Sequence, residues 1–229
     1  PVPKGSIYAA YGTSFNPAAE NLTLSSATDA ANNVNLDPEK SRTIELGTKW
    51  ELFDRRLSLN ASIFRTDKSD ARTVDPVTSA ITPSGDQRVQ GFELGVAGSI
   101  TKDWHVFGGY TYMDSETRAS ANPTEVGLVL PNTPKHTFAF WTTYELPWNL
   151  EVGAGAQYVG ERMNNSSTRR FAEDYWLFDA MAAYHVNENF SLRLNVYNLL
   201  DEDYIDLVGG GHFVPGAGRF AMLTANFSF

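Results

Sequence analysis

The chain has 229 residues and a formal net charge of −9, with 18 Lys and Arg against 27 Asp and Glu. The acidic balance argues against a nucleic-acid binder, which needs a basic surface for the phosphate backbone, and the lack of cysteine excludes disulfides and thiolate metal sites. Hydrophobic residues make up 42% of the chain and aromatic residues 13%, which suits strands that are apolar on one face only.

Period-two alternation of apolar and polar residues predicts antiparallel strands along the whole chain. In one segment, Leu192, Leu194 and Val196 alternate with polar neighbours and therefore share one face of a strand. The predicted strands cover residues 5–14, 41–52, 57–67, 87–100, 104–116, 134–146, 149–160, 174–186, 189–200 and 218–229. No apolar run reaches the roughly 18 residues of a transmembrane helix, whereas a membrane-spanning strand needs only about 9–11.

The connections between these strands are alternately short and long. Short ones fall at 53–56, 101–103, 147–148 and 187–188, and long ones at 15–40, 68–86, 117–133, 161–173 and 201–217. A transmembrane barrel has short turns on the periplasmic side and long loops outside. With no interdomain linker in the sequence, residues 1–229 are predicted to be one all-β unit, an antiparallel transmembrane β-barrel wall of about ten strands.

Aromatic residues gather at the ends of the predicted strands. Trp50, Trp104 and Trp148 lie at or beside short turns, and Tyr112, Tyr158 and Tyr175 lie near the long loops. Rings at both ends are typical of the girdles at the two membrane interfaces. The competing interpretation is that they are core aromatics of a soluble β-protein.

The last predicted strand ends at Phe229. This segment resembles the closing strand of bacterial outer-membrane proteins, in which a terminal aromatic residue is part of the signal read by the barrel assembly machinery. The resemblance implies that role for Phe229.

Five motifs in order extend the resemblance to nearly the whole chain. They are LDPEKSRTIELGTKW at 36–50, QRVQGFELGVAGSI at 87–100, LPNTPKHTFAFWTTYEL at 130–146, NVYNLLDEDYID at 195–206 and PGAGRFAMLTANFSF at 215–229. Their order and spacing are similar to the last ten strands of the 22-stranded barrel of TonB-dependent siderophore receptors. The detailed similarity is greatest to receptors for ferric catecholate siderophores.

This resemblance implies a function and a location. It implies uptake of a ferric siderophore through the outer membrane of a Gram-negative bacterium, driven by the TonB–ExbB–ExbD complex. It also implies an N-terminal region with a TonB box and a plug domain, neither of which is in this sequence. The wall would contact outer-membrane lipid and lipopolysaccharide, and its first and last strands would need partners, because unpaired backbone groups are costly in lipid.

The sequence contains no set of residues typical of an enzyme active site. It contains no G-x-S-x-G, H-E-x-x-H or P-loop motif. Its four histidines are scattered over different segments. The acidic cluster at 201–206 lacks the order of a calcium loop and is expected to be a solvated loop. We therefore predict no catalytic residue, no enzyme activity and no protein-bound metal or cofactor, since the siderophore itself would carry the iron.

Charged residues on the predicted polar faces form the first candidate set. The set is Glu45, Lys49, Glu93, Asp179 and Arg193. In a wide barrel these side chains are expected to face the lumen, where they would solvate the wall or pack against a plug.

Residues of the long loops form the second candidate set. A ferric tris-catecholate is anionic and aromatic, so arginines and aromatic rings suit it. The predicted ligand-binding residues are Arg118, Arg162, Arg169, Arg170, Phe171, His212 and Phe213. Surface solubility and lipopolysaccharide contact are competing explanations for the arginines. Competing functions for the whole chain are a small closed outer-membrane barrel that acts as an enzyme or a passive porin, and a soluble β-sandwich binding module.

Overall fold

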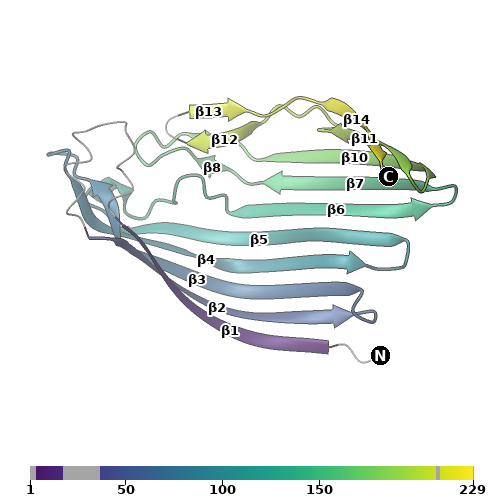
Figure 1. The fold of residues 1–229 in the computed structure, drawn as a ribbon. Coiled ribbons are helices and arrows are strands. Elements are labelled where there is room, and N and C mark those ends of the chain that lie inside the picture. The colour runs from purple at the N-terminus through teal and green to yellow at the C-terminus, as the bar shows by residue number, and fades with distance from the viewer. Residues whose placement is uncertain (1–3, 18–36, 210–211, 229) are drawn as a thin grey trace.

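The computed structural model describes residues 4–17, 37–209 and 212–228 of the chain. These residues form one curved sheet of ten antiparallel strands in the order β1-β2-β3-β4-β5-β6-β7-β10-β11-β14 (Figure 1). The strands are β1 Lys4–Asn16, β2 Glu39–Leu52, β3 Leu57–Val74, β4 Ile81–Ser99, β5 Trp104–Ala119, β6 His136–Leu146, β7 Leu150–Val159, β10 Tyr175–Asn187, β11 Phe190–Tyr197 and β14 Phe220–Phe227. Each predicted strand corresponds to one of them.

Directly paired residues of neighbouring strands lie on the same face of the sheet. The pairing register therefore defines which residues form each of its two faces. Leu46 pairs with Ile63, and Ile63 pairs with Phe92, so one apolar row crosses three strands. We call the side that carries this row the apolar face; it includes Ile7, Leu46, Ile63, Leu94, Phe138, Trp176, Leu194 and Leu223. The opposite side, the polar face, includes Glu45, Ser62, Glu93, Thr111, Arg193 and Thr224.

The sheet is a single layer, and its apolar face is exposed. Ile63 keeps 59% of its surface accessible and Leu223 keeps 68%. Hydrophobic burial among the described residues is sparse, and Met163 is the largest fully buried side chain there. An apolar face of this extent is unsuited to water and suited to the hydrocarbon of a bilayer.

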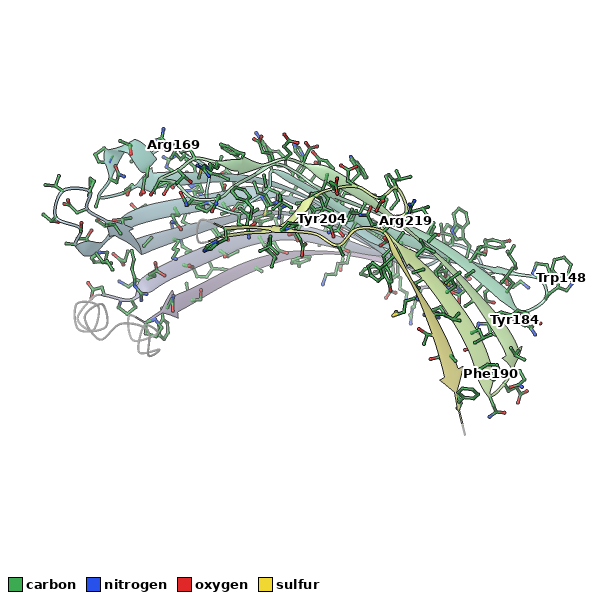
Figure 2. All side chains as sticks on the ribbon, turned by 90° about the horizontal axis from the view of Figure 1, so that it is seen from above. Trp148, Arg169, Tyr184, Phe190, Tyr204 and Arg219 are labelled. Carbon is green, nitrogen blue, oxygen red and sulfur yellow. The ribbon has the colours of Figure 1, made fainter. Side chains whose placement is uncertain are left out.

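The short and long connections lie at opposite ends of the strands (Figure 1). Figure 2 shows the labelled aromatic residues Trp148, Tyr184 and Phe190 at the short-turn end, with Arg169 at the other. Toward the loop end, the Tyr158 and Trp176 rings pack with centroids 4.9 Å apart on the apolar face. These placements fit two interfacial girdles. Tyr175 is an exception, because it is buried on the polar face.

One predicted long loop is largely strand. Residues 68–86 were expected to connect two strands, but β3 and β4 continue until Val74 pairs with Ile81. The Thr73 hydroxyl lies 2.9 Å from the Ser84 hydroxyl, and such polar contacts support the extension. This part of the hairpin lacks apolar alternation, because polar residues occupy both of its faces, so periodicity could not detect it.

Three of the remaining long loops contain short elements of their own, whereas residues 18–36 of the predicted loop at 15–40 lie outside the described residues. The short elements are the 3-10 helix η2 Pro123–Glu125 and the strands β8 Arg162–Met163, β9 Phe171–Ala172, β12 Ile205–Gly209 and β13 His212–Pro215. β8 pairs with β9, and β12 pairs with β13. Within the described ranges, no helix is long and apolar enough to cross a membrane. Phe229, the predicted assembly signal, lies outside the described residues.

Candidate ligand-binding site at the loop end

Three long connections pack against one another at one end of the sheet. We call them the loop cap; it comprises the described residues of 117–133, 161–173 and 201–217. Arg169 Nη2 donates to the Thr124 carbonyl oxygen at 2.8 Å, and Ser166 Oγ donates to Glu125 Oε1 at 2.9 Å. These bonds fasten the first connection to the second, so that the loops hold a defined shape.

Arg162 fastens the second connection to the third. Its Nη1 donates to the Asp206 carbonyl oxygen at 2.8 Å, and its Nη2 donates to the Ile205 carbonyl oxygen. The guanidinium lies 5.5 Å from the centroid of the Tyr175 ring. Only 5% of the Arg162 surface is exposed. Arg162 is therefore a buried side chain that holds two connections of the loop cap together, and we call it the latch.

A cavity of about 440 Å³ opens beside this latch. Aromatic side chains from four segments line it: Phe171, Tyr175, Tyr204 and Phe213. Its charged lining residues are acidic: Glu173, Asp174, Glu202 and Asp203. The cavity therefore offers rings for stacking, while its own charge is negative.

Tyr204 forms one wall of the cavity. Its ring packs against the Tyr175 ring at an interplanar angle of 44°, with centroids 4.6 Å apart. Gly216 lies against the same ring, and a Cβ there would come within 2.0 Å of Tyr204 Cζ, so only glycine permits this approach. Burial raises the pKa of Tyr204, and the nearby Asp206 carboxylate raises it further.

Asn198 anchors the start of the third connection. Its backbone is in the left-handed region at φ 49°, and only 4% of its surface is exposed. Its side-chain amide donates to the carbonyl oxygens of Glu202 at 2.9 Å and Ala217 at 3.1 Å, and its Oδ1 accepts from the Glu202 amide at 2.8 Å. The third connection is thus tied to the entry of β14.

Sequence reasoning missed Asn198, although it lies inside the NVYNLLDEDYID motif. The signal that could have found it is an asparagine directly after an apolar strand, because asparagine tolerates the left-handed backbone conformation. The acidic cluster that follows was predicted to be a solvated loop. Asp201 instead accepts a bond from the Arg219 amide at 2.8 Å, so this carboxylate helps to position the last strand.

The structure brings only part of the predicted ligand-binding set together. Phe171 and Phe213 line the same cavity. Arg169, Arg170 and His212 are exposed in the loop cap. Arg162 is engaged with loop carbonyls, and Arg118 lies apart from the cavity, paired with Glu116 at 2.9 Å.

The five residues predicted to face the lumen all share the polar face. Tyr8 Oη donates to a Glu45 carboxylate oxygen, and Lys49 Nζ lies 5.2 Å from the centroid of the Tyr8 ring. Asp179 Oδ1 accepts from the Asn198 amide at 2.8 Å, which links the polar face to the loop cap. The register places Glu93 and Arg193 on the polar face as well. No three His, Asp or Glu side chains gather as metal ligands in the part of the chain that the structure describes.

Comparisons with known proteins decide the family. Residues 1–199 match the family described as "TonB dependent receptor-like, beta-barrel". The chain belongs to this family. It is 40% identical over 240 residues to the probable TonB-dependent receptor BfrD of Bordetella pertussis, covering 100% of this chain and 32% of BfrD.

Two further relatives agree with this family assignment. The catecholate siderophore receptor Fiu of Escherichia coli K12 is 39% identical over 236 residues, covering 98% of this chain and 31% of Fiu. The crystal structure of the siderophore receptor PiuA from Acinetobacter baumannii superimposes with a TM-score of 0.90 at 38% identity, covering 97% of this chain and 34% of PiuA. The chain spans about a third of the length of the curated relatives that it matches.

The predicted fold class, family and location are thereby confirmed. The curved sheet is part of the wall of a larger outer-membrane β-barrel. A small closed barrel finds no support, because β1 and β14 lie at opposite edges of the sheet within the described residues. The relatives named above are receptors rather than enzymes.

Proposed function

We propose that the complete protein containing this chain is a TonB-dependent receptor that imports a ferric siderophore of the catecholate class. The observation that carries this proposal is the 39% identity to the catecholate siderophore receptor Fiu, which extends over 98% of the chain. An identity spread over wall and loops together supports a shared transport role. It favours a receptor over an enzyme.

The proposed transport uses the two faces differently. The apolar face would contact lipid, and the polar face would line a water-filled lumen around a plug domain. Energy would come from the TonB–ExbB–ExbD complex through a TonB box in the N-terminal region. The charged polar-face residues, such as Glu93 and Arg193, would solvate the wall and pack against the plug.

The loop cap is the proposed place of ligand capture. Phe171 and Phe213 would stack on catechol rings, because both line one aromatic cavity. The negative lining of that cavity opposes an anionic chelate, so exposed cations must attract it first. Arg169, Arg170 and His212 are the candidates for that step, since all are exposed in the loop cap; Arg169 would attract the chelate in addition to its bond to the Thr124 carbonyl oxygen.

The structure supports different roles for the other two predicted arginines. Arg162 is a positioning residue, since its guanidinium already holds the carbonyl oxygens of the third connection. Arg118 pairs with Glu116 away from the cavity, so it would contribute to ligand capture at most through the general field. Iron would remain inside the siderophore, with no protein ligand and no resident cofactor.

Uptake measurements test the proposal in the complete receptor. Cells that carry the gene should accumulate iron from a ferric tris-catecholate under iron limitation, and deletion of either the gene or tonB should abolish this uptake. Uptake that persists without TonB would make the protein a passive porin. Recovery of a chemically cleaved siderophore from the purified receptor would contradict the absence of enzyme activity.

A double variant tests the loop arginines. Arg169→Ala with Arg170→Ala should weaken chelate binding to the purified receptor, and unchanged affinity would remove both residues from the site. The matched control is Arg55→Ala with Arg56→Ala, which removes the same charge at a short turn on the opposite end of the strands. The control should bind the chelate with unchanged affinity.

A further inference from the structure

Three arginines converge on one carboxylate near the loop end of the apolar face. Arg88 Nε lies 2.7 Å from Asp67 Oδ1, Arg65 Nε lies 3.0 Å from Asp67 Oδ2, and Arg42 Nη2 lies 3.6 Å from the same Oδ2. We call these four residues the arginine cluster. A single carboxylate leaves two positive charges unbalanced, in a chain whose net charge is −9.

The register places this cluster on the membrane side of the wall. Arg42 pairs with Asp67, and Asp67 pairs with Arg88, so the three share one face. Arg42, Asp67 and Arg88 lie four positions along their strands from Leu46, Ile63 and Phe92, respectively. An even spacing keeps residues of a strand on the same face, so this face is the apolar one. Arg65 lies only two positions beyond Ile63, which is roughly 7 Å along a strand.

The level of the cluster is that of lipid headgroups. Phe92 stacks on Tyr112 with centroids 5.6 Å apart at the outer margin of the apolar face. Aromatic rings of this kind mark the interface between hydrocarbon and headgroups. The guanidiniums that follow them therefore lie where phosphates of the surrounding lipid are found.

A cavity of about 920 Å³ adjoins the cluster. Its basic lining residues are Lys40, Arg42, Lys68, Arg88 and Arg118, and its acidic ones are Asp67 and Asp86. Tyr11 and Phe15 add aromatic surface to the same cavity. Lys40, Lys68 and Arg118 each have a carboxylate partner, in Asp70, Glu39 and Glu116 respectively. The unbalanced positive charge is therefore that of the arginine cluster, and such charge beside aromatic rings suits a ligand that is both anionic and amphiphilic.

We propose that the arginine cluster binds the phosphorylated headgroup of a lipid in the outer leaflet, with the acyl chains lying along the apolar face. Guanidiniums recognise phosphate oxygens through paired hydrogen bonds, and several can share one phosphate. Arg42 and Arg65 remain accessible, with side chains 57% and 45% exposed.

Lipid binding to the complete receptor tests this site. The probe is bisphosphorylated lipid A, added to the receptor in detergent and detected by native mass spectrometry. The variant Arg42→Gln, Arg65→Gln and Arg88→Gln should lose roughly tenfold or more in affinity, since it removes three cations that would face the lipid phosphates. The control Arg55→Gln with Arg56→Gln at the short-turn end should bind as the unchanged receptor does.

A second experiment varies the ligand instead of the receptor. Lipid A from which both phosphates have been removed should bind at least roughly tenfold more weakly than the bisphosphorylated form. Inorganic phosphate at the same concentration should fail to displace the lipid, because it lacks the acyl chains. Equal binding of dephosphorylated lipid A, or displacement by inorganic phosphate, would overturn the proposal.

A second variant keeps the test decisive if the triple variant does not fold. Asp67→Asn retains all three arginines and removes their shared counter-charge, so affinity for bisphosphorylated lipid A should rise by roughly threefold or more. An ion-pair network that only joins three strands would show no such rise. Unchanged or weaker binding by a folded Asp67→Asn receptor would overturn the proposal.

Discussion

The wall and the loop cap are stabilised in different ways. In the wall, each inner strand is paired with two neighbours, so its stability is spread over many equivalent contacts. In the loop cap, a few buried polar groups hold segments that pair over only two to five residues. The wall therefore tolerates most single changes that respect its two faces, whereas the cap depends on individual side chains.

The largest effect is expected when a side chain is added at a glycine that lies in close contact with the backbone of the neighbouring strand. A Cβ at Gly91 would lie 1.8 Å from the Tyr112 carbonyl oxygen. Gly91→Val should therefore separate β4 from β5 at a cost of about 3 kcal/mol or more, and it should block assembly. Loss of the heat-modifiable band on a gel of outer-membrane fractions measures this.

Gly12 provides the matched control in the same sheet. A Cβ at Gly12 has open space around it, with no described atom within 4 Å. Gly12→Val should assemble normally. If both valine variants assembled equally well, close strand contact at Gly91 would not be what excludes a side chain.

Asn198→Ala should produce the largest effect within the cap. The change leaves the amide of Glu202 and the carbonyl oxygen of Ala217 without their partner, at a cost of about 2–4 kcal/mol. Faster hydrogen exchange at residues 199–204 and 217–219, with β3 and β4 unchanged, is the expected result. Asn195→Ala on the polar face of β11 is the control, and equal exchange in the two variants would contradict the anchoring role of Asn198.

Arg162→Lys should have a smaller effect on the same region. An ammonium cannot reproduce the fork that reaches two adjacent carbonyl oxygens, so one bond worth about 1–2 kcal/mol is lost. Hydrogen exchange should increase in β12 and β13 while the wall keeps its protection. Increased exchange in β2 or β3 instead would show that the latch acts on the wall.

The smallest effect is a pH dependence of the cap. The folded pKa of Tyr204 is raised, so the folded cap holds the phenolic proton at pH values where the unfolded segment has lost it. The contribution of Tyr204 to the stability of the cap is therefore fully present below about pH 10, and it is lost as the pH rises toward the folded pKa. Hydrogen exchange of residues 202–207 across this range measures it, and Tyr204→Phe should flatten the dependence; an unaltered dependence would exclude Tyr204 as its source.

The same contrast explains what the sequence could predict. Alternation located each strand of the wall and the shared face of residues such as Glu45 and Arg193, because a period of two follows from strand geometry. Two-residue strands such as β8 have no period, and a buried contact such as that of Asn198 with Ala217 joins positions far apart in the chain. Phe171 and Phe213 were predicted as candidates from their residue type. The hydrogen bonds of Arg162 could not be predicted, since only the folded loops bring the carbonyl oxygens of residues 205 and 206 close to its guanidinium.

Site-directed spin labelling of β11 tests most directly the claim that the apolar face meets lipid and the polar face meets water. The chain has no cysteine, so single cysteines at 192, 193, 194 and 195 can be labelled in a complete receptor freed of other cysteines. Labels at 192 and 194 should be accessible to oxygen dissolved in the bilayer, and labels at 193 and 195 to a water-soluble nickel complex. Accessibility that does not alternate, or that alternates in the opposite phase, would contradict this account of the wall.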